Sequence, residues 1–287
     1  MPRMATSRPA SSSVLRRLRP VFRALVQDVA RYVVRAQARL APTEVRDKGV
    51  GDYVTRIDLE AERRLRIGLL RALPEAGFLG EESTPSGLER EWVFVVDPVD
   101  GTSNYARGHT CFCVAVALLR HGQPVLACIH REPEGVLYEA VRGGGAFRSG
   151  RRLRLRADAG ALDDRGIVGV QWFRRPRPAD LEFVLRLQER GARVRLLGST
   201  VAQILDVAAG RLDANVQAPG RLWDLAAPCL VASEAGARCT DWRGRPLFPV
   251  RDFAVRHQPS LVAPPLAWRK LRRWLAELPN PVVVPLA

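Results

Sequence analysis

Helical spacing of apolar residues is the first pattern along the chain. Within residues 14–40, apolar side chains recur every three or four positions, which predicts an amphipathic helix of about 20 residues after Pro20. Residues 57–73 show the same spacing and predict a second helix. Four leucines form the apolar stripe of this second helix: Leu59, Leu65, Leu69 and Leu73.

Short apolar runs predict strands in the first half of the chain and alternate with helical segments in the second half. The run at 92–97 is continuous and ends in an acid, which is typical of a buried strand. The other predicted strands of the first half cover 76–79, 111–119, 125–130, 136–141 and 146–148. After about residue 160 the predicted strands are 167–171, 193–196 and 213–217, and the helices are 179–190, 200–209, 223–235 and 265–277. This alternation predicts an α/β layer after an antiparallel sheet.

The composition is that of a globular chain. Of 287 residues, 47% are apolar and 26% are charged, which excludes wholesale disorder. There is no apolar run of 18 residues, so the sequence predicts no membrane partner. The five cysteines are odd in number and mostly lie among apolar residues, which favours reduced thiols and a cytoplasmic protein over a disulfide framework.

The charge is unusual, with 45 basic residues against 30 acidic ones and a net charge of +15. Only Lys48 and Lys270 are lysines, and so much arginine beside abundant Ala, Gly and Pro is typical of a GC-rich genome. The alternative is an arginine surface that attracts polyanions such as nucleic acid. No RNA-binding motif accompanies the charge, so nucleic acid is kept only as an alternative partner.

The densest chemical motif is the segment Asp97–Asn104, which reads DPVDGTSN. A predicted strand runs into it, so both aspartates lie at the carboxyl end of that strand. Pro98 favours a turn between them, and Thr102 and Ser103 are candidate caps for a short following helix. Two carboxylates beside a helix start would repel phosphate unless cations lay between them, and Mg²⁺ prefers such oxygen ligands. The simpler alternative is an acidic turn whose side chains cap its own amides.

Two further acidic spots support a metal site. Glu81 and Glu82 follow the predicted strand at 76–79, and Asp224 lies at the cap or in the first turn of the helix at 223–235. Each alone is consistent with a solvated turn or a plain helix cap. Three acidic sets at strand ends or helix starts together favour a shared divalent cation.

These motifs carry a family resemblance. In order and spacing, the chain resembles the inositol monophosphatase family of Mg²⁺-dependent, lithium-sensitive sugar phosphatases over roughly residues 20 to 265. The matching segments are Asp52–Asp58, Gly80–Ser83, Trp92–Asn104, Leu222–Ala227 and Glu234–Gly236, with weaker matches at 143–147 and 198–199. The resemblance implies a layered αβαβα sandwich of the inositol monophosphatase and fructose-1,6-bisphosphatase type. It also implies a homodimer.

The resemblance also implies a set of metal ligands. Glu81, Asp97 and the backbone carbonyl of Val99 would hold a first Mg²⁺. Asp97, Asp100 and Asp224 would hold a second, with Asp97 bridging the two ions. Glu81 would reach a third, weaker ion through water.

Catalytic and phosphate-binding roles follow from the same resemblance. Thr102, hydrogen-bonded to Asp58, would help Glu81 orient and deprotonate the attacking water. The amides of Gly101 and Thr102 would hold the phosphate, with Ser103 beside them. Glu82 lies beside this cluster and is a candidate to contact the metal ligands without binding an ion itself.

Two positions bear on the substrate. Lys48 falls where the family often has a lysine near the phosphate. Gln217 stands where the family often has a glutamate that receives a sugar hydroxyl, and an amide can donate as well as accept. Arg221 lies nearby in sequence and is a candidate for contact with a second anionic group.

We therefore expect a Mg²⁺-dependent phosphomonoesterase, with two or three ions, that hydrolyses inositol monophosphate or a related sugar or polyol phosphate. Histidinol phosphate and fructose 1,6-bisphosphate are alternative substrates, and a basic nucleic-acid-associated factor is the alternative class. An aspartyl nucleophile is disfavoured, because such phosphatases place two aspartates two positions apart and here the spacing is three.

The same reading divides the chain into four parts. Residues 1–13 are expected to be disordered, and 279–287 form a Pro-rich tail. An α+β half with the antiparallel sheet and most metal ligands is expected over 14–160. An α/β half that carries Asp224 is expected over 161–278.

Overall fold

The structure is a computed structural model that describes residues 12–39, 45–49, 52–156, 162, 166–171, 178–253 and 258–277. Side chains at 45–49 and 52–55, among others, lie outside the description. The expected disordered start, apart from its last two residues, and the expected Pro-rich tail also lie outside the described residues.

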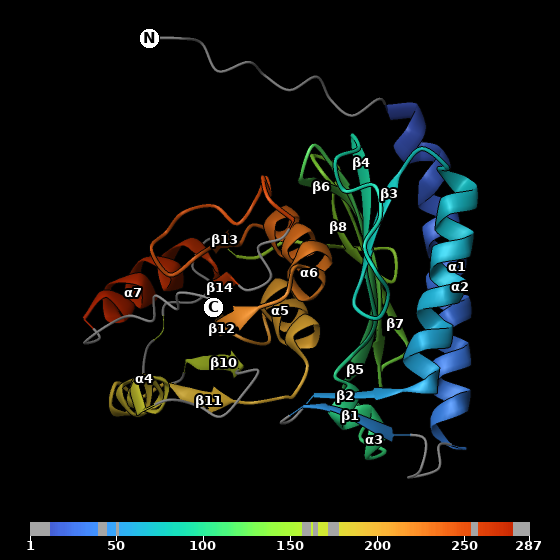
Figure 1. Cartoon of the computed structure of the whole chain (residues 1–287). Coiled ribbons are helices and arrows are strands. Elements are labelled where there is room, and N and C mark those ends of the chain that lie inside the picture. The colour runs from blue at the N-terminus through green and yellow to red at the C-terminus, as the bar shows by residue number, and fades with distance from the viewer. Residues whose placement is uncertain are drawn as a thin grey trace, which may run out of the picture.

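Helices and sheets alternate in five layers (Figure 1). Helices α1 and α2 cover one face of a seven-stranded sheet, and α5 and α6 lie between that sheet and a five-stranded one. Helices α4 and α7 cover the outer face of the smaller sheet. The predicted αβαβα architecture is confirmed. The helices are α1 (Ser12–Gln37), α2 (Arg56–Ala72), α3 (Thr102–Ala106), α4 (Pro178–Glu189), α5 (Thr200–Ala208), α6 (Leu222–Ala235) and α7 (Pro265–Ala276).

The larger sheet has the order β3-β4-β5-β6-β7-β8-β9, with β3 parallel to β4 and all other neighbours antiparallel. Its strands are β3 (Gly77–Gly80), β4 (Trp92–Asp100), β5 (Phe112–Arg120), β6 (Gln123–Glu132), β7 (Val136–Val141), β8 (Gly145–Arg148) and β9 (Arg151–Leu153). The predicted hairpin at 125–141 is β6–β7. Since β3 and β4 are parallel, their carboxyl ends meet at one edge, where the acidic motifs begin.

The smaller sheet has the order β11-β10-β12-β14-β13. Its strands are β10 (Ile167–Gln171), β11 (Arg193–Arg195), β12 (Ala214–Gly220), β13 (Arg238–Thr240) and β14 (Gln258–Ala263). Strand β10 is parallel to both neighbours, whereas β14 runs antiparallel to β12 and β13. A separate antiparallel pair is formed by β1 (Val45–Gly49) and β2 (Asp52–Thr55), which the apolar pattern did not predict.

Helix α1 begins earlier than predicted, at Ser12 rather than after Pro20. A proline inside a helix costs about 3 kcal/mol because it removes one hydrogen bond and crowds the preceding turn. Here Pro20 lies on the exposed face, while Leu15 and Leu18 before it and Phe22 after it are buried. Burying each such side chain contributes roughly 1.5–3 kcal/mol, which offsets the proline.

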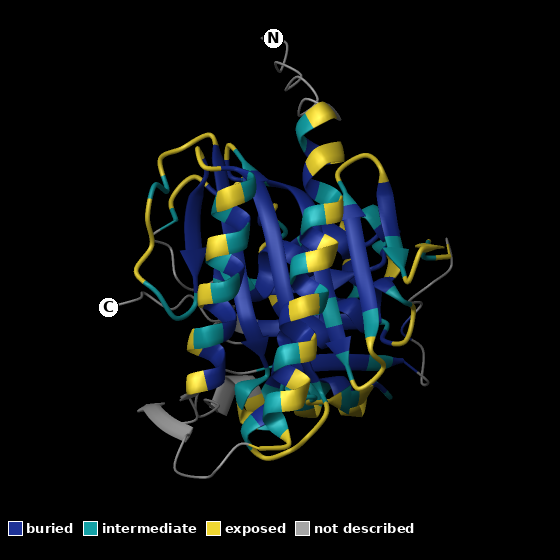
Figure 2. Cartoon of the chain, turned by 90° about the vertical axis from the view of Figure 1, so that its right-hand side faces the viewer, coloured by how far each residue is buried: buried dark blue, intermediate teal, exposed yellow. Residues whose placement is uncertain are grey.

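The stripe of α2 also differs from the prediction. Leu59 is 47% exposed, whereas Ile57, Ala61, Leu65 and Leu69 are buried at intervals of four residues. Leu59 lies two positions from Ile57 and from Ala61, so it points to the opposite side of the helix. Figure 2 shows the exposed outer faces of the helices that cover this side of the sheet, above buried strands.

Alternation along β4 divides its side chains between two cores. Phe94 and Val96 pack toward α1 and α2, and Val93 and Val95 pack toward α5 and α6. This continues to Asp97, which therefore points toward the middle helical layer. Among the described residues, no helix combines the length and apolar character that a membrane span requires.

Candidate metal and phosphate site

A β-bulge at the end of β4 brings Asp97 and Asp100 to the same face of the sheet. Asp97 pairs with Ala115 and Asp100 with Cys113, so Pro98 and Val99 together stand opposite a single residue of β5. Three positions along a regular strand would place the two carboxylates on opposite faces, and the extra residue reverses this. Proline suits the bulge because it has no N–H to donate. The Val99 amide donates to Asp97 Oδ1 at 3.1 Å, which closes a local turn.

Asp224 reaches this pair from the middle layer. It lies in the first turn of α6, where its Oδ2 accepts a hydrogen bond of 2.9 Å from the Arg221 amide. One carboxylate oxygen from each of Asp97, Asp100 and Asp224 lies within 4.8 Å of the others. The three residues are 1%, 6% and 4% exposed. The structure thus gathers three buried acids from segments more than 120 residues apart in the chain.

Burial and mutual repulsion disturb the titration of this cluster. Burial raises the pKa of Asp97 well above its ordinary value, and the charges of Glu81, Asp100, Asp224 and Asp58 raise it further. Burial and the charge of Asp100 raise the pKa of Asp224 to about 8. Burial raises the pKa of Asp100 to about 6, although hydrogen bonds from Ser199 and following amides oppose the shift. Such a cluster fits a divalent cation, whose charge offsets the repulsion and whose preference is for carboxylate and carbonyl oxygens.

Glu81 follows directly after β3 and lies beside Asp97. Gly80, the last residue of β3, pairs with Val96 across the parallel strands, so Glu81 follows β3 at the level where β4 reaches Asp97. Glu81 is half-buried, and its charge contributes to the raised pKa of Asp97. Its position is therefore within electrostatic reach of the cluster.

Glu62 holds the backbone beside Glu81 and was not singled out from the sequence. This buried residue of α2 accepts a hydrogen bond of 2.8 Å from the Glu82 amide through Oε2. Its carboxylate also packs against Gly80, where an added Cβ would lie 2.3 Å from Oε2. The sequence signal was available, since Glu62 is four residues after Asp58 on the same helix face.

Thr102 connects the motif to α2. Its Oγ1 donates toward Asp58 Oδ1 at 3.3 Å and Val99 O at 3.0 Å. The prediction that the Thr102 or Ser103 side chain caps the short helix is wrong. The cap of α3 is Gly101, which has a φ of 92° and no side chain, and an added Cβ there would lie 2.9 Å from the Cys111 carbonyl oxygen. The Thr102 hydroxyl is thereby left to contact Asp58.

The remaining predicted site residues are placed less centrally. Ser103 is exposed on α3, and Glu82 is half-buried. Lys48 lies in β1, but its side chain is outside the described residues. Gln217 is fully buried, and its amide is engaged by protein groups, because Nε2 donates to Thr200 Oγ1 at 3.1 Å and Oε1 accepts from Ser260 Oγ at 3.3 Å.

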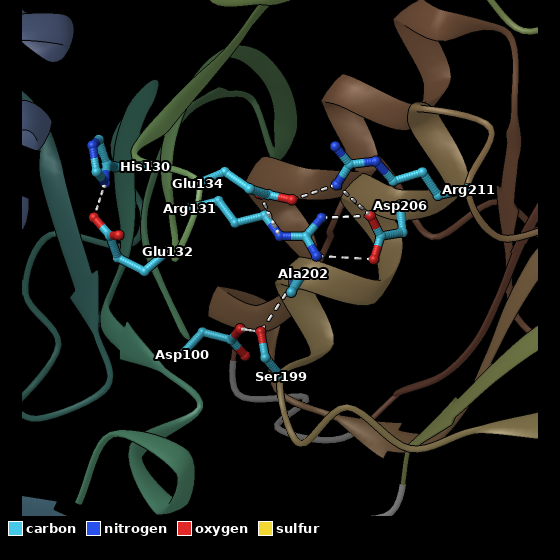
Figure 3. Close-up of polar contacts among 9 residues, drawn as sticks. All are labelled: Asp100, His130, Arg131, Glu132, Glu134, Ser199, Ala202, Asp206 and Arg211. Carbon is cyan, nitrogen blue, oxygen red and sulfur yellow. Dashed lines mark hydrogen bonds and ion pairs between the residues drawn. The ribbon is translucent and has the colours of Figure 1, made fainter. Parts of the chain in front are cut away.

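Ser199 is a second residue whose role was not predicted. It caps α5, where its Oγ accepts a hydrogen bond of 3.1 Å from the Ala202 amide, and it donates to Asp100 Oδ2 (Figure 3). The amides of Thr200 and Val201 donate to Asp100 as well, at 3.1 and 3.2 Å. Glycine and serine before a helix are a recognisable capping signal, but only the fold reveals that the cap faces Asp100.

Comparison with known proteins identifies the family of this chain. The model of the inositol monophosphatase family matches residues 15–279. Inositol-1-monophosphatase of Rhizobium meliloti (strain 1021) is 38% identical over 201 residues, which cover 69% of this chain and 75% of the relative. Nus factor SuhB of Xylella fastidiosa (strain Temecula1 / ATCC 700964) is 36% identical over 210 residues, covering 72% of this chain and 75% of the relative.

A solved structure extends the likeness to the fold. The crystal structure of extragenic suppressor protein suhB from Bartonella henselae superposes with a TM-score of 0.81 and 30% identity, covering 91% of this chain and 98% of that one. The family match and these relatives show that a chain with this layered α/β fold is a phosphatase. Within that class, the chain belongs to the inositol monophosphatase family.

Proposed function

We propose that this chain hydrolyses a small phosphorylated sugar or polyol, such as inositol monophosphate, using Mg²⁺ and a water nucleophile. The observation that carries the proposal is the convergence of Asp97, Asp100 and Asp224 within 4.8 Å in a buried position. Burial raises the pKa of all three carboxylates, and a pair of divalent cations would offset the cost of gathering their charges there.

The chain's own residues divide the work of holding the ions. Asp97, Asp100 and Asp224 would supply carboxylate oxygens. Glu81, which directly follows β3, would supply a further carboxylate ligand to one of the ions. The Val99 carbonyl accepts from Thr102 but has a second lone pair to offer a cation. When bound, Mg²⁺ would stabilise the charge of the phosphoryl group and lower the pKa of water. These groups would hold two ions, and a third ion would be bound more weakly near Glu81.

Proton handling and phosphate positioning fall to residues at the start of α3. The Thr102 hydroxyl, fixed by Asp58 and Val99, would orient the attacking water, and Glu81 would accept its proton. The amides of Gly101 and Thr102 would donate to the phosphate oxygens. The water oxygen would bond to phosphorus as the phosphorus–oxygen bond to the sugar breaks, and the leaving oxygen would take up a proton from solvent, which releases inorganic phosphate and the alcohol.

Substrate preference is proposed to differ from that of a site with glutamate at position 217. Gln217 bridges Thr200 and Ser260 and carries no charge, so it would shape the pocket wall rather than bind a hydroxyl as an anion. Inositol monophosphate and other polyol phosphates remain the first choice. Histidinol phosphate and fructose 1,6-bisphosphate are the alternatives on the same scaffold.

A cytoplasmic homodimer is proposed as the working form. The five cysteines are free thiols, which supports a reducing compartment. The homodimer rests on the resemblance to the inositol monophosphatase family alone.

One further role has its own support. The net charge of +15 and the 36% identity with a protein named Nus factor SuhB favour a nucleic-acid-associated role alongside the phosphatase. Gel shifts with RNA at increasing salt, beside an unrelated protein of equal charge, test it. Binding no tighter than that of the unrelated protein would remove the support.

The phosphatase itself is tested by phosphate release from sugar, polyol and amino-alcohol phosphates with Mg²⁺, comparing wild type with Asp97→Asn. We expect the variant to lose nearly all Mg²⁺-dependent turnover while its circular dichroism spectrum stays unchanged. Turnover at the wild-type rate in that variant would reject the site assignment.

A further inference from the structure

Helix α5 contacts the seven-stranded sheet at two charged points. The first is its capped start, where Ser199 and two amides donate to Asp100 at the end of β4. The second lies further along the helix, where Asp206 accepts two hydrogen bonds from Arg131 of β6 (Figure 3). These two bonds join Nη1 to Oδ1 at 2.5 Å and Nη2 to Oδ2 at 3.0 Å, and both residues are 6% exposed.

The two points match in spacing. Asp100 pairs with Cys113, and Cys113 pairs with Arg131, so the three residues form one row across β4, β5 and β6. Two strand spacings separate the ends of this row, about 9.6 Å. Ser199 and Asp206 are seven residues apart, which is about two helical turns or 10 Å on one face of the helix. Both contacts are therefore made at once, and together they fix the position of α5 along its axis.

Neighbouring charges fix the orientation of this contact. Arg131 Nε lies 3.2 Å from Glu134 Oε2, and Arg211 lies 2.5 Å from Glu134 and 3.3 Å from Asp206. The group holds two arginines and two acids, so its charges balance. A buried ion pair adds little stability over a well-packed apolar pair, whereas a two-pronged arginine contact imposes direction.

We propose that Arg131 and Asp206 are positioning residues for Asp100. Their contact sets how α5 lies across the sheet, and α5 in turn sets the donors that orient the Asp100 carboxylate toward the metal cluster. This inference rests on the proposed function, because it takes Asp100 to be a cation ligand. Groups that orient metal ligands without touching the ion commonly change metal affinity 10- to 100-fold when they are lost.

The test measures Mn²⁺ binding by titration calorimetry well below the melting temperature of each protein. The double variant Arg131→Leu/Asp206→Leu removes the contact without leaving a lone buried charge. We expect its dissociation constant for Mn²⁺ to rise about 10-fold or more. Arg131→Lys, which keeps the charge but not the two-pronged geometry, should show an intermediate rise of about threefold.

A matched control lies on the opposite face of the same sheet. Arg23 of α1 binds the buried carboxylate of Glu139 on β7 at 2.6 Å, away from α5. The double variant Arg23→Leu/Glu139→Leu also removes an ion pair with a buried carboxylate, and it should bind Mn²⁺ within twofold of wild type.

The outcomes separate the two proposals. Unchanged Mn²⁺ affinity in Arg131→Leu/Asp206→Leu, or an equal loss in the control, would overturn the positioning role and leave the metal site intact. No Mn²⁺ binding by the wild-type chain would overturn the proposed function, and the positioning role with it. If the leucine double variant does not fold, Arg131→Lys decides, and wild-type affinity there overturns the positioning role.

Discussion

In the absence of divalent cations, the free energy of unfolding of this protein should fall as the pH rises. Folding raises the pKa of Asp224 from 3.8 to about 8 and that of Asp100 from 3.8 to about 6. An acid whose pKa is raised by folding contributes stability that is fully present below its unfolded pKa and is lost as the pH rises through its folded pKa. Asp97 shifts in the same direction.

The size of the effect follows from linkage. For each such carboxyl group, the free energy of unfolding falls by about 1.4 kcal/mol per pH unit between its unfolded and its folded pKa. Asp224 therefore accounts for about 4 kcal/mol between pH 5 and pH 8, and Asp100 adds about 1 kcal/mol between pH 5 and pH 6. A loss of this size should lower the melting temperature by on the order of 10 °C.

The assay is thermal unfolding in EDTA at half-unit steps from pH 5 to pH 8, repeated with saturating Mg²⁺. Mg²⁺ should raise the melting temperature more at pH 8 than at pH 5, because at pH 5 it must displace protons from the carboxylates. Asp224→Asn, which keeps an acceptor for the Arg221 amide, should remove Asp224's share of the decline. A metal-free melting temperature that is flat or rises over this range would refute the reasoning.

Three further predictions concern single features of the site. Thr102→Val should lower kcat about 10- to 100-fold with little change in KM, because it removes the hydroxyl that contacts Asp58, and steady-state kinetics check it. Gly80→Ala should destabilise by about 1–3 kcal/mol through its overlap with Glu62, measurable by urea unfolding, and a neutral effect would contradict the close contact. Lithium should inhibit phosphate release, and indifference to lithium would argue for an altered third-ion position.

Regular elements were readable from the sequence because local patterning decides them. The apolar run of β4, the β6–β7 hairpin and the alternation after residue 160 all follow from side-chain period and turn residues. Local patterns failed where tertiary contacts override them. Buried side chains before and after Pro20 stabilise α1, so the helix continues through the proline. Leu59 is exposed although it is apolar.

The sequence predicted the acidic motifs of the site, but it did not predict the contacts that hold their side chains in place. The spacing of Asp97 and Asp100 alone places them on opposite faces of a strand, and only the bulge reverses this. The contacts of Ser199 with Asp100 and of Arg131 with Asp206 join residues 99 and 75 positions apart. A local sequence pattern cannot predict these long-range contacts, because they form only when α5 packs against the sheet.

The most direct measurement is a crystal structure of the wild-type chain soaked in Mn²⁺, with anomalous diffraction collected at the manganese edge. The account predicts anomalous peaks about 2.0–2.3 Å from oxygens of Asp97, Asp100 and Asp224, with Asp97 shared between two of them. Peaks only at the protein surface, or side chains of these three residues turned away from one another, would contradict it.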